Sequence, residues 1–259
     1  MYYSQFLFLY FINGGFVDRN IVIQAIVLHT RRDGVNNTNL TLLSLDLGII
    51  TVRAFGAKTS KKAPKAFRFQ EGQFFLYHNP TKSQYVLKDV NLICDHDLIS
   101  TQFSRVINAS LMSEIILKTY CDNLAFTYDL FAKCLDLLED NSINEDLIII
   151  QFVLRLIKDH GFFEDFKHCP SCNKLYLDDE VLYFSDSLSV PSCNDCSNSS
   201  NMILPPKARK YLSITQDLNL EEAIKVQLFE TTASRIKTFM LRWIVRIIGY
   251  PLKSLNVYN

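Results

Sequence analysis

The 259-residue sequence has no net charge and contains none of the short motifs that mark the large enzyme families. Its 27 basic residues are matched by 27 acidic ones, so any electrostatic argument must come from local clustering. G-x-x-x-x-G-K-[ST], G-x-G-x-x-G, H-E-x-x-H and G-x-S-x-G are all absent. The His-x-Glu pair of zinc deaminases is absent as well. Candidate enzymes therefore find little support.

The sequence also lacks an apolar segment long enough to span a bilayer. The N-terminal run from Phe6 to Ile12 is seven residues long, with no Lys or Arg before it and no small-residue cleavage site after it. We therefore expect no signal peptide, no membrane partner and a cytoplasmic protein. Residues 1–20 are interpreted as a disordered or mis-called N-terminal extension.

Short strands are predicted over residues 21–97. β-branched and aromatic segments alternate there with turn-like stretches such as "RRDGVNNTN" and "HNPTKS". The five segments are "IVIQAIVLHT", "LTLLSLD", "GIITVRAFG", "QFFLYH" and "QYVLKDVNLI". Five strands in about seventy residues suggest a small closed or half-closed barrel, for which an OB-fold is one candidate.

Helical periodicity begins after residue 100. Apolar residues recur at helical spacing from Phe103 to Ile115 and from Leu124 to Leu138. "EDLIIIQFVLRLIKDHG" is apolar nearly all round, which predicts a buried central helix that stops at Gly161. A final long helix is predicted from a cap near Asn219 to Gly249. The fold class is therefore α+β and multidomain, with a mainly helical second domain over residues 98–259.

The most specific pattern is a pair of Cys-x-x-Cys knuckles, Cys169/Cys172 and Cys193/Cys196, in a module over about residues 163–200. Two such knuckles can place four thiolates around one Zn²⁺, and a site filled by four protein ligands is structural because no position is open for water. Redox dithiols or disulfides are the alternatives. The other three cysteines, Cys94, Cys121 and Cys134, are interpreted as buried thiols.

A local basic run lies between Leu47 and Gln70, where the sequence has no acidic residue. Loops of small barrels can hold single strands with cations along the phosphates, so we interpret the run as a phosphate-binding loop, against a solvated surface loop as the alternative. Phe67 and Phe69 could stack on bases, although their spacing also fits one core-facing strand side. The basic residues are Arg53, Lys58, Lys61, Lys62, Lys65 and Arg68.

The last predicted helix carries a second basic patch. Arg235, Arg242 and Arg246 fall within roughly 40° of one another at 100° per residue, on the side away from the apolar residues. This stripe is either a solvated helix face or a surface for a partner or for DNA.

From about Ile21 to Tyr258 the chain resembles the bacterial recombination and repair mediator RecO. The segments that carry the resemblance are "AIVLHTRRDG", "LTLLSLDLGIITVRAFGAKTSKKAPKAFRFQEGQFFLYH", "FVLRLIKDHGFFEDFKHCPSC", "LYFSDSLSVPSCNDC" and "RIIGYPLKSLNVY". The resemblance implies an N-terminal OB-fold and a helical domain with a zinc module whose ligands match the four knuckle cysteines. It also implies that the run from Lys58 to Arg68 is the DNA-binding loop.

The same resemblance implies a non-enzymatic function. RecO-like proteins bind single- and double-stranded DNA, anneal complementary strands and load the RecA recombinase, together with RecR, onto strands coated by single-strand binding protein. The acidic tail of single-strand binding protein docks on the helical domain in that family, and the stripe on the last helix is a candidate partner for it. Two alternatives stay open: a nucleic-acid-modifying enzyme with a structural zinc ribbon, and a protein-interaction module without DNA binding.

Overall fold

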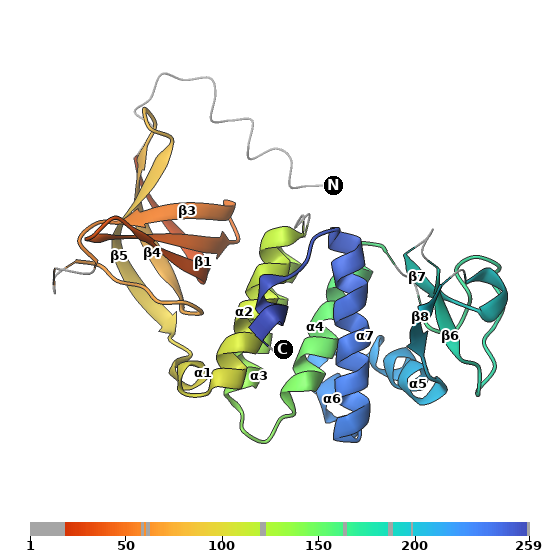
Figure 1. Ribbon diagram of the computed structural model, residues 1–259. Coiled ribbons are helices and arrows are strands. Elements are labelled where there is room, and N and C mark those ends of the chain that lie inside the picture. Colours follow the sequence, from red (N-terminus) through yellow and green to blue (C-terminus); the bar gives the residue numbers. More distant parts are fainter. Residues whose placement is uncertain are drawn as a thin grey trace.

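The computed structural model describes residues 19–57, 60, 63–119, 123–162, 165–185, 189–197 and 199–257. A closed five-stranded barrel lies at one end of the molecule, helices form the middle, and a small sheet lies at the opposite end (Figure 1). The barrel strands are β1 (Asn20–Asp33), β2 (Asn37–Ser44), β3 (Gly48–Ala54), β4 (Glu71–Asn79) and β5 (Gln84–Cys94). They pair in the order β1-β2-β3-β5-β4, and β1 closes the barrel on β4. The five predicted strands and the OB-like barrel are confirmed.

Strand β1 is buried on both faces, which explains its nearly continuous apolar sequence. Ala25 and Val27 face the barrel interior, whereas Ile26 and Leu28 belong to the core shared with the helices. A register shift between Val27 and His29 bends the strand at this point. The barrel therefore presents an apolar outer face to the helical part of the chain.

The helical part is built around α4, the helix that was predicted to be buried. The side chain of Asn144 caps the N-terminus of α4, and Gly161 follows the C-terminal end with a φ of 70°. None of the helices among the described residues is both long and apolar enough to cross a membrane. The helices are α1 (Asp97–Thr101), α2 (Phe103–Lys118), α3 (Leu124–Glu139), α4 (Glu145–Asp159), α5 (Pro206–Thr215), α6 (Leu220–Lys225) and α7 (Glu230–Ile248).

The prediction of one long helix from Asn219 to Gly249 is wrong. Asn219 does cap a helix, since its side chain accepts a hydrogen bond from the Glu222 N–H at 2.8 Å, but that helix is α6 and ends at Lys225. Val226 is extended, and α7 begins four residues later. Val226 and Leu228, in the break, pack partly buried against the same apolar core as α6 and α7. The predicted end at Gly249 is confirmed by its φ of 75°.

Two short 3-10 helices and a three-stranded sheet complete the fold. The sheet comprises β6 (Leu182–Ser185), β7 (Val190–Ser192) and β8 (Ser199–Leu204) in the order β7-β6-β8. The 3-10 helices are η1 (Asn194–Cys196) and η2 (Lys253–Val257). The second of them is held against α2, because Glu114 accepts hydrogen bonds from the backbone N–H groups of Lys253 and Ser254, each at 2.8 Å.

The barrel and the helices share one apolar core. Ile26, Leu28 and Phe69 from the barrel cluster with the buried residues of the helices. A polar contact supports this junction, because the Tyr128 hydroxyl on α3 donates to the Glu71 carboxylate on β4 at 2.8 Å. The division into domains at residues 97 and 98 stays a prediction.

Candidate metal centre and nucleic-acid interface

The structure brings the four knuckle cysteines together. Their Sγ atoms all lie within 4.8 Å of one another, and those of Cys172 and Cys193 are 3.8 Å apart. Four sulfurs at about 2.3 Å from one central ion would be separated by about 3.8 Å in a tetrahedron. A disulfide would require a separation of about 2.05 Å, and the four thiols are free. The cluster can therefore hold one metal ion.

Local backbone geometry builds both knuckles. In the first, the Asn173 N–H donates to the Cys169 carbonyl at 2.8 Å, and Asn173 has a left-handed φ of 57° that reverses the chain. In the second, η1 follows Cys193, whose carbonyl accepts from the Cys196 N–H at 3.1 Å. Each turn places two sulfurs on the same side of the backbone.

The electrostatics of the cluster favour a cation at its centre. Burial raises the pKa of the Cys169 thiol, but backbone N–H groups of Cys193, Cys172 and Ser171 outweigh burial and lower that pKa to about 6. Thiol hydrogen bonds with Cys193 and Cys172 raise the pKa of Cys196 to about 12. The Cys169 thiol therefore ionises readily, whereas ionisation of the Cys196 thiol is unfavourable. The positive charge of a bound cation would stabilise the additional thiolates.

The cysteine module packs against the helices through one buried arginine side chain and one cluster of aromatic rings. Arg209 on α5 donates to the carbonyls of Phe166 at 3.3 Å and Leu177 at 2.6 Å, and its side chain is almost fully buried. Trp243 on α7 donates to the Ser189 carbonyl at 2.8 Å and makes edge-on contacts with Phe184 of β6. The four-cysteine cluster is thus anchored to α5 and α7.

The remaining cysteines differ in their surroundings. Cys134 is fully buried, as predicted, and Cys121 lies outside the described residues. The prediction of a buried thiol is wrong for Cys94, which is half-buried at the end of β5 with its Sγ 3.6 Å from His96 Nδ1. The barrel ends at this residue, so its side chain meets the start of α1 and not a core.

The predicted basic run separates into distinct environments. Lys58, Lys61 and Lys62 lie outside the described residues. The Arg53 Nε atom lies 2.5 Å from Asp33, so its charge is largely satisfied within the protein. Arg68 points to the helical part, where its Nη1 atom is 3.5 Å from the Ser110 hydroxyl. Lys65 is exposed beside a hollow at the end of the barrel.

Phe67 and Phe69 do not share a strand face, because residues 64–70 form no strand. The Phe69 N–H donates to the Val27 carbonyl at 2.8 Å, and a φ of 73° at Phe69 turns its side chain into the core. Phe67 is 63% exposed. The core prediction is thus right for Phe69 and wrong for Phe67, whose ring is available for stacking.

Two arginines of this surface were missed by the sequence reasoning. Arg31 and Arg32, at the end of β1, are exposed and line the same hollow as Lys65 and Phe67, which has a volume of about 410 Å³. The positive charges also affect the nearby His29. Burial lowers the pKa of this histidine, and the charges of Arg68 and Arg31 lower that pKa further. The only sequence signal was the pair "RR" in a segment interpreted as a turn.

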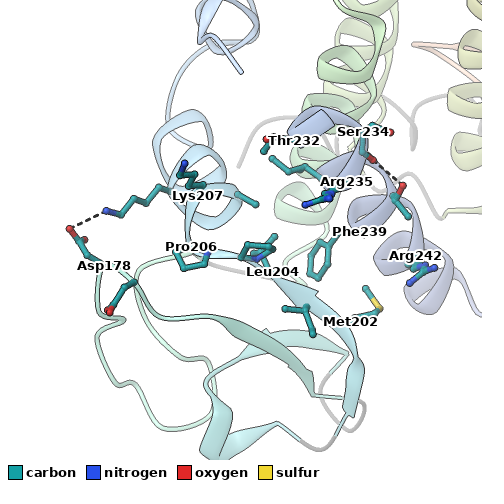
Figure 2. A pocket seen from close by; sticks show the side chains of 17 residues that line it. Asp178, Met202, Leu204, Pro206, Lys207, Thr232, Ser234, Arg235, Phe239 and Arg242 are labelled. Carbon is teal, nitrogen blue, oxygen red and sulfur yellow. Dashed lines mark hydrogen bonds and ion pairs between the residues drawn. The ribbon is translucent and has the colours of Figure 1, made fainter. Parts of the chain in front are cut away.

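The arginine stripe lies on the exposed side of α7, as its spacing predicts. Arg235 and Arg242 line a pocket of about 790 Å³ bounded by α7, β8 and the start of α5. Figure 2 shows both arginines on one side of it, Lys207 opposite, and Leu204 and Phe239 between them. Arg246 lies apart from this pocket, with its guanidinium carbon 4.8 Å from the Phe184 ring centre.

Comparison with known proteins adds a second line of observation. Residues 100–256, the helical part with its cysteine module, match the family described as Recombination protein O C terminal. The chain belongs to the RecO family. The DNA repair protein RecO of Clostridium novyi (strain NT) is 22% identical over 244 residues, which cover 91% of this chain and 92% of that protein. The DNA repair protein RecO of Clostridium perfringens (strain 13 / Type A) is 27% identical and covers 80% of this chain and 87% of that protein.

A match over 91% of the chain includes most of the barrel. RecO membership therefore extends beyond the helical region, and both parts of the predicted architecture belong to one family pattern. RecO is a DNA repair family, which directs attention to the cationic hollow at the end of the barrel.

Proposed function

We propose that this RecO-family chain is a mediator of DNA repair and homologous recombination that binds single- and double-stranded DNA and anneals complementary strands. In this proposal it also helps to load RecA, together with RecR, onto strands coated by single-strand binding protein. It acts by binding and makes or breaks no covalent bond. Its place of action would be the cytoplasm, at the nucleoid.

The observation that carries the proposal is the cationic hollow of the barrel. Arg31, Arg32 and Lys65 are exposed around it, and the exposed ring of Phe67 stands at its edge. Cations that follow phosphates and an aromatic ring that stacks on a base are the two elements of single-strand binding by OB-folds. Lys58, Lys61 and Lys62 belong to the same predicted surface, with Arg53 and Arg68 as secondary contributors.

The pocket beside α7 is the proposed site for the acidic tail of single-strand binding protein. Its floor is apolar, with Leu204 and Phe239. Four cations line it, Arg235, Arg242, Lys207 and Lys210, against two carboxylates, Asp178 and Asp179, the first of which pairs with Lys210. An acidic peptide with an apolar end matches that combination of charge and surface. Arg246 would extend the cationic side along the helix.

The four-cysteine cluster is proposed to hold one structural Zn²⁺. Cys169, Cys172, Cys193 and Cys196 would fill all four positions of a tetrahedral ion, which leaves no place for a reacting water. The ion would fix the two knuckles, and through them the loops that Arg209 and Trp243 hold. No chemical step is assigned to it.

The test is annealing of complementary strands coated with single-strand binding protein, without ATP and over a salt series. We expect acceleration at low salt that declines steeply as salt rises, because phosphate contacts release counterions. The control uses single-strand binding protein without its acidic tail. Substitution of Arg235 and Arg242 should slow annealing of strands coated with the intact protein, and should have no effect on strands coated with the tailless protein. DNA binding should remain in both cases. Absence of both DNA binding and annealing at low salt would leave the protein-interaction alternative.

A further inference from the structure

A second cluster of metal-ligating side chains lies where the barrel joins the helices. Cys94 ends β5, His96 precedes α1, and Glu139 ends α3. The ligand atoms of these three residues all lie within 4.8 Å of one another. Asp136, one turn before Glu139 on α3, adds a carboxylate oxygen 3.8 Å from the His96 Nδ1 atom. This cluster shares no residue with the four-cysteine module.

Among the described residues, the buried imidazole of His96 has one hydrogen-bond partner, the Cys94 Sγ atom 3.6 Å from Nδ1. The His96 side chain is 1% exposed, and its Nε2 atom has no hydrogen-bond partner among the described residues. The Nδ1 atom is 3.6 Å from Glu139 Oε2 and 3.8 Å from Asp136 Oδ1, which is beyond the usual 2.7–3.2 Å of a hydrogen bond to oxygen. The carboxylates therefore surround the imidazole nitrogen without bonding to it.

Those separations match the edges of a metal coordination shell. A tetrahedral ion with bonds of about 2.0–2.3 Å to nitrogen, oxygen and sulfur separates its ligand atoms by about 3.3–3.8 Å. His96 Nδ1 is 3.6 Å from Cys94 Sγ and 3.6 Å from Glu139 Oε2. Three donors of three kinds thus cluster together, with two of their separations in the range that one ion requires.

The backbone is held in an unfavourable conformation to bring the imidazole here. His96 has φ 49° and ψ 42°, the left-handed region that a residue with a side chain seldom adopts. Glu139 is positioned by its other oxygen, which accepts a hydrogen bond from the Leu98 N–H at 3.0 Å. Local strain of this kind persists where the surrounding structure fixes a functional side chain.

We propose that Cys94, His96 and Glu139 form a second metal site for a divalent transition ion such as Zn²⁺, with Asp136 or a water molecule as the fourth ligand. A thiolate, an imidazole and a carboxylate suit Zn²⁺ and Co²⁺ better than Mg²⁺ or Ca²⁺. The Asp136 side chain is 67% exposed, which gives the ion a path from solvent. The bound ion would tie the end of the barrel to α3 and so fix the DNA-binding part relative to the helices.

The rival explanation is a protonated His96 paired with the two carboxylates and no ion. That state keeps Nδ1–carboxylate separations of 3.6 and 3.8 Å, which are too long for hydrogen bonds, whereas the Nε2 proton lacks an acceptor among the described residues in either state. The two explanations differ in one measurable quantity, the number of metal ions that the folded chain binds.

The experiment is reconstitution of the full-length metal-free protein with Co²⁺ under reducing conditions, followed by metal analysis and absorption spectroscopy. We expect about two Co²⁺ per chain for the unmodified protein and about one for Cys94→Ser. The difference spectrum between them should contain thiolate-to-metal absorption from a single sulfur. Cys134→Ala, which removes a buried thiol that belongs to neither ligand set, is the matched control and should still bind about two.

Glu139→Gln provides a second variant that keeps the fold, because its amide oxygen can still accept from the Leu98 N–H. It should lower the affinity for the second Co²⁺ by at least tenfold, within the 10–100-fold range typical of weakened metal sites. Equal Co²⁺ counts and identical spectra for the unmodified protein, Cys94→Ser and Glu139→Gln would overturn the proposal. The outcome is independent of DNA binding.

Discussion

Replacing Arg31, Arg32 and Lys65 together by Gln should flatten the salt dependence of single-strand binding. None of the three makes an ion pair with another described residue, whereas Arg53 is held by Asp33. Each phosphate contact contributes about 0.7 to the slope of log affinity against log salt on single strands, so three contacts contribute about 2. Between about 50 and 200 mM salt, the ratio of the single-strand affinity of the unmodified protein to that of the variant should therefore decrease about 20-fold.

The assay is fluorescence anisotropy with a labelled single strand at five or more salt concentrations. The matched control replaces three exposed lysines elsewhere, Lys82, Lys133 and Lys225, so that net charge changes equally. If the phosphates lie along the hollow, the control keeps the original slope. An equal loss of slope in both variants, or no loss in the first, would refute the assignment and point to long-range attraction or to another surface.

Three further predictions follow from single contacts. Phe67→Ala should weaken single-strand binding by about 1–3 kcal/mol without changing the salt slope, because stacking and not charge is lost. Arg209→Met should lower the free energy of unfolding by about 3 kcal/mol, measured by urea titration, because it leaves buried carbonyls of the cysteine module unpaired. Burial raises the pKa of Glu114, but hydrogen bonds from Ser254 and Lys253 outweigh it and hold that pKa at about 2. Its contribution is thus complete above about pH 4.5 and lost as the pH falls toward 2, and acid unfolding of Glu114→Gln should lack this component, as measured by circular dichroism.

The strands, the main helices and the cysteine cluster could be predicted because their signals are local. A long segment that is apolar nearly all round predicted α4, and the spacing of the knuckles was sufficient to group Cys169 with Cys193. The break between α6 and α7 could not be predicted, since no Pro or Gly marks Val226 and its contacts are with a core built from distant segments. Periodicity reports which residues are apolar, not which neighbours they meet.

The sites that sequence reasoning missed depend on contacts between distant segments. Arg31 and Lys65 approach one another only because the barrel closes, and "RRDG" by itself is typical of a turn. Cys94 and His96 are two residues apart in the sequence, but Glu139 reaches them only when α3 packs beside the end of β5. The signal that was available, a cysteine two residues before a histidine, is too short to be specific.

The only tryptophan of the chain has an optical consequence. Trp243 is fully buried in the seam between α7 and the cysteine module, with its indole N–H bonded to the Ser189 carbonyl and its ring 6.1 Å from that of Phe166. Its emission therefore reports on that seam alone, without a label and without interference from another indole. Metal removal that loosens the module should shift the emission to longer wavelength, whereas a change confined to the barrel should leave it unchanged. The emission of Trp243 thus reports whether the cysteine module is packed against α7.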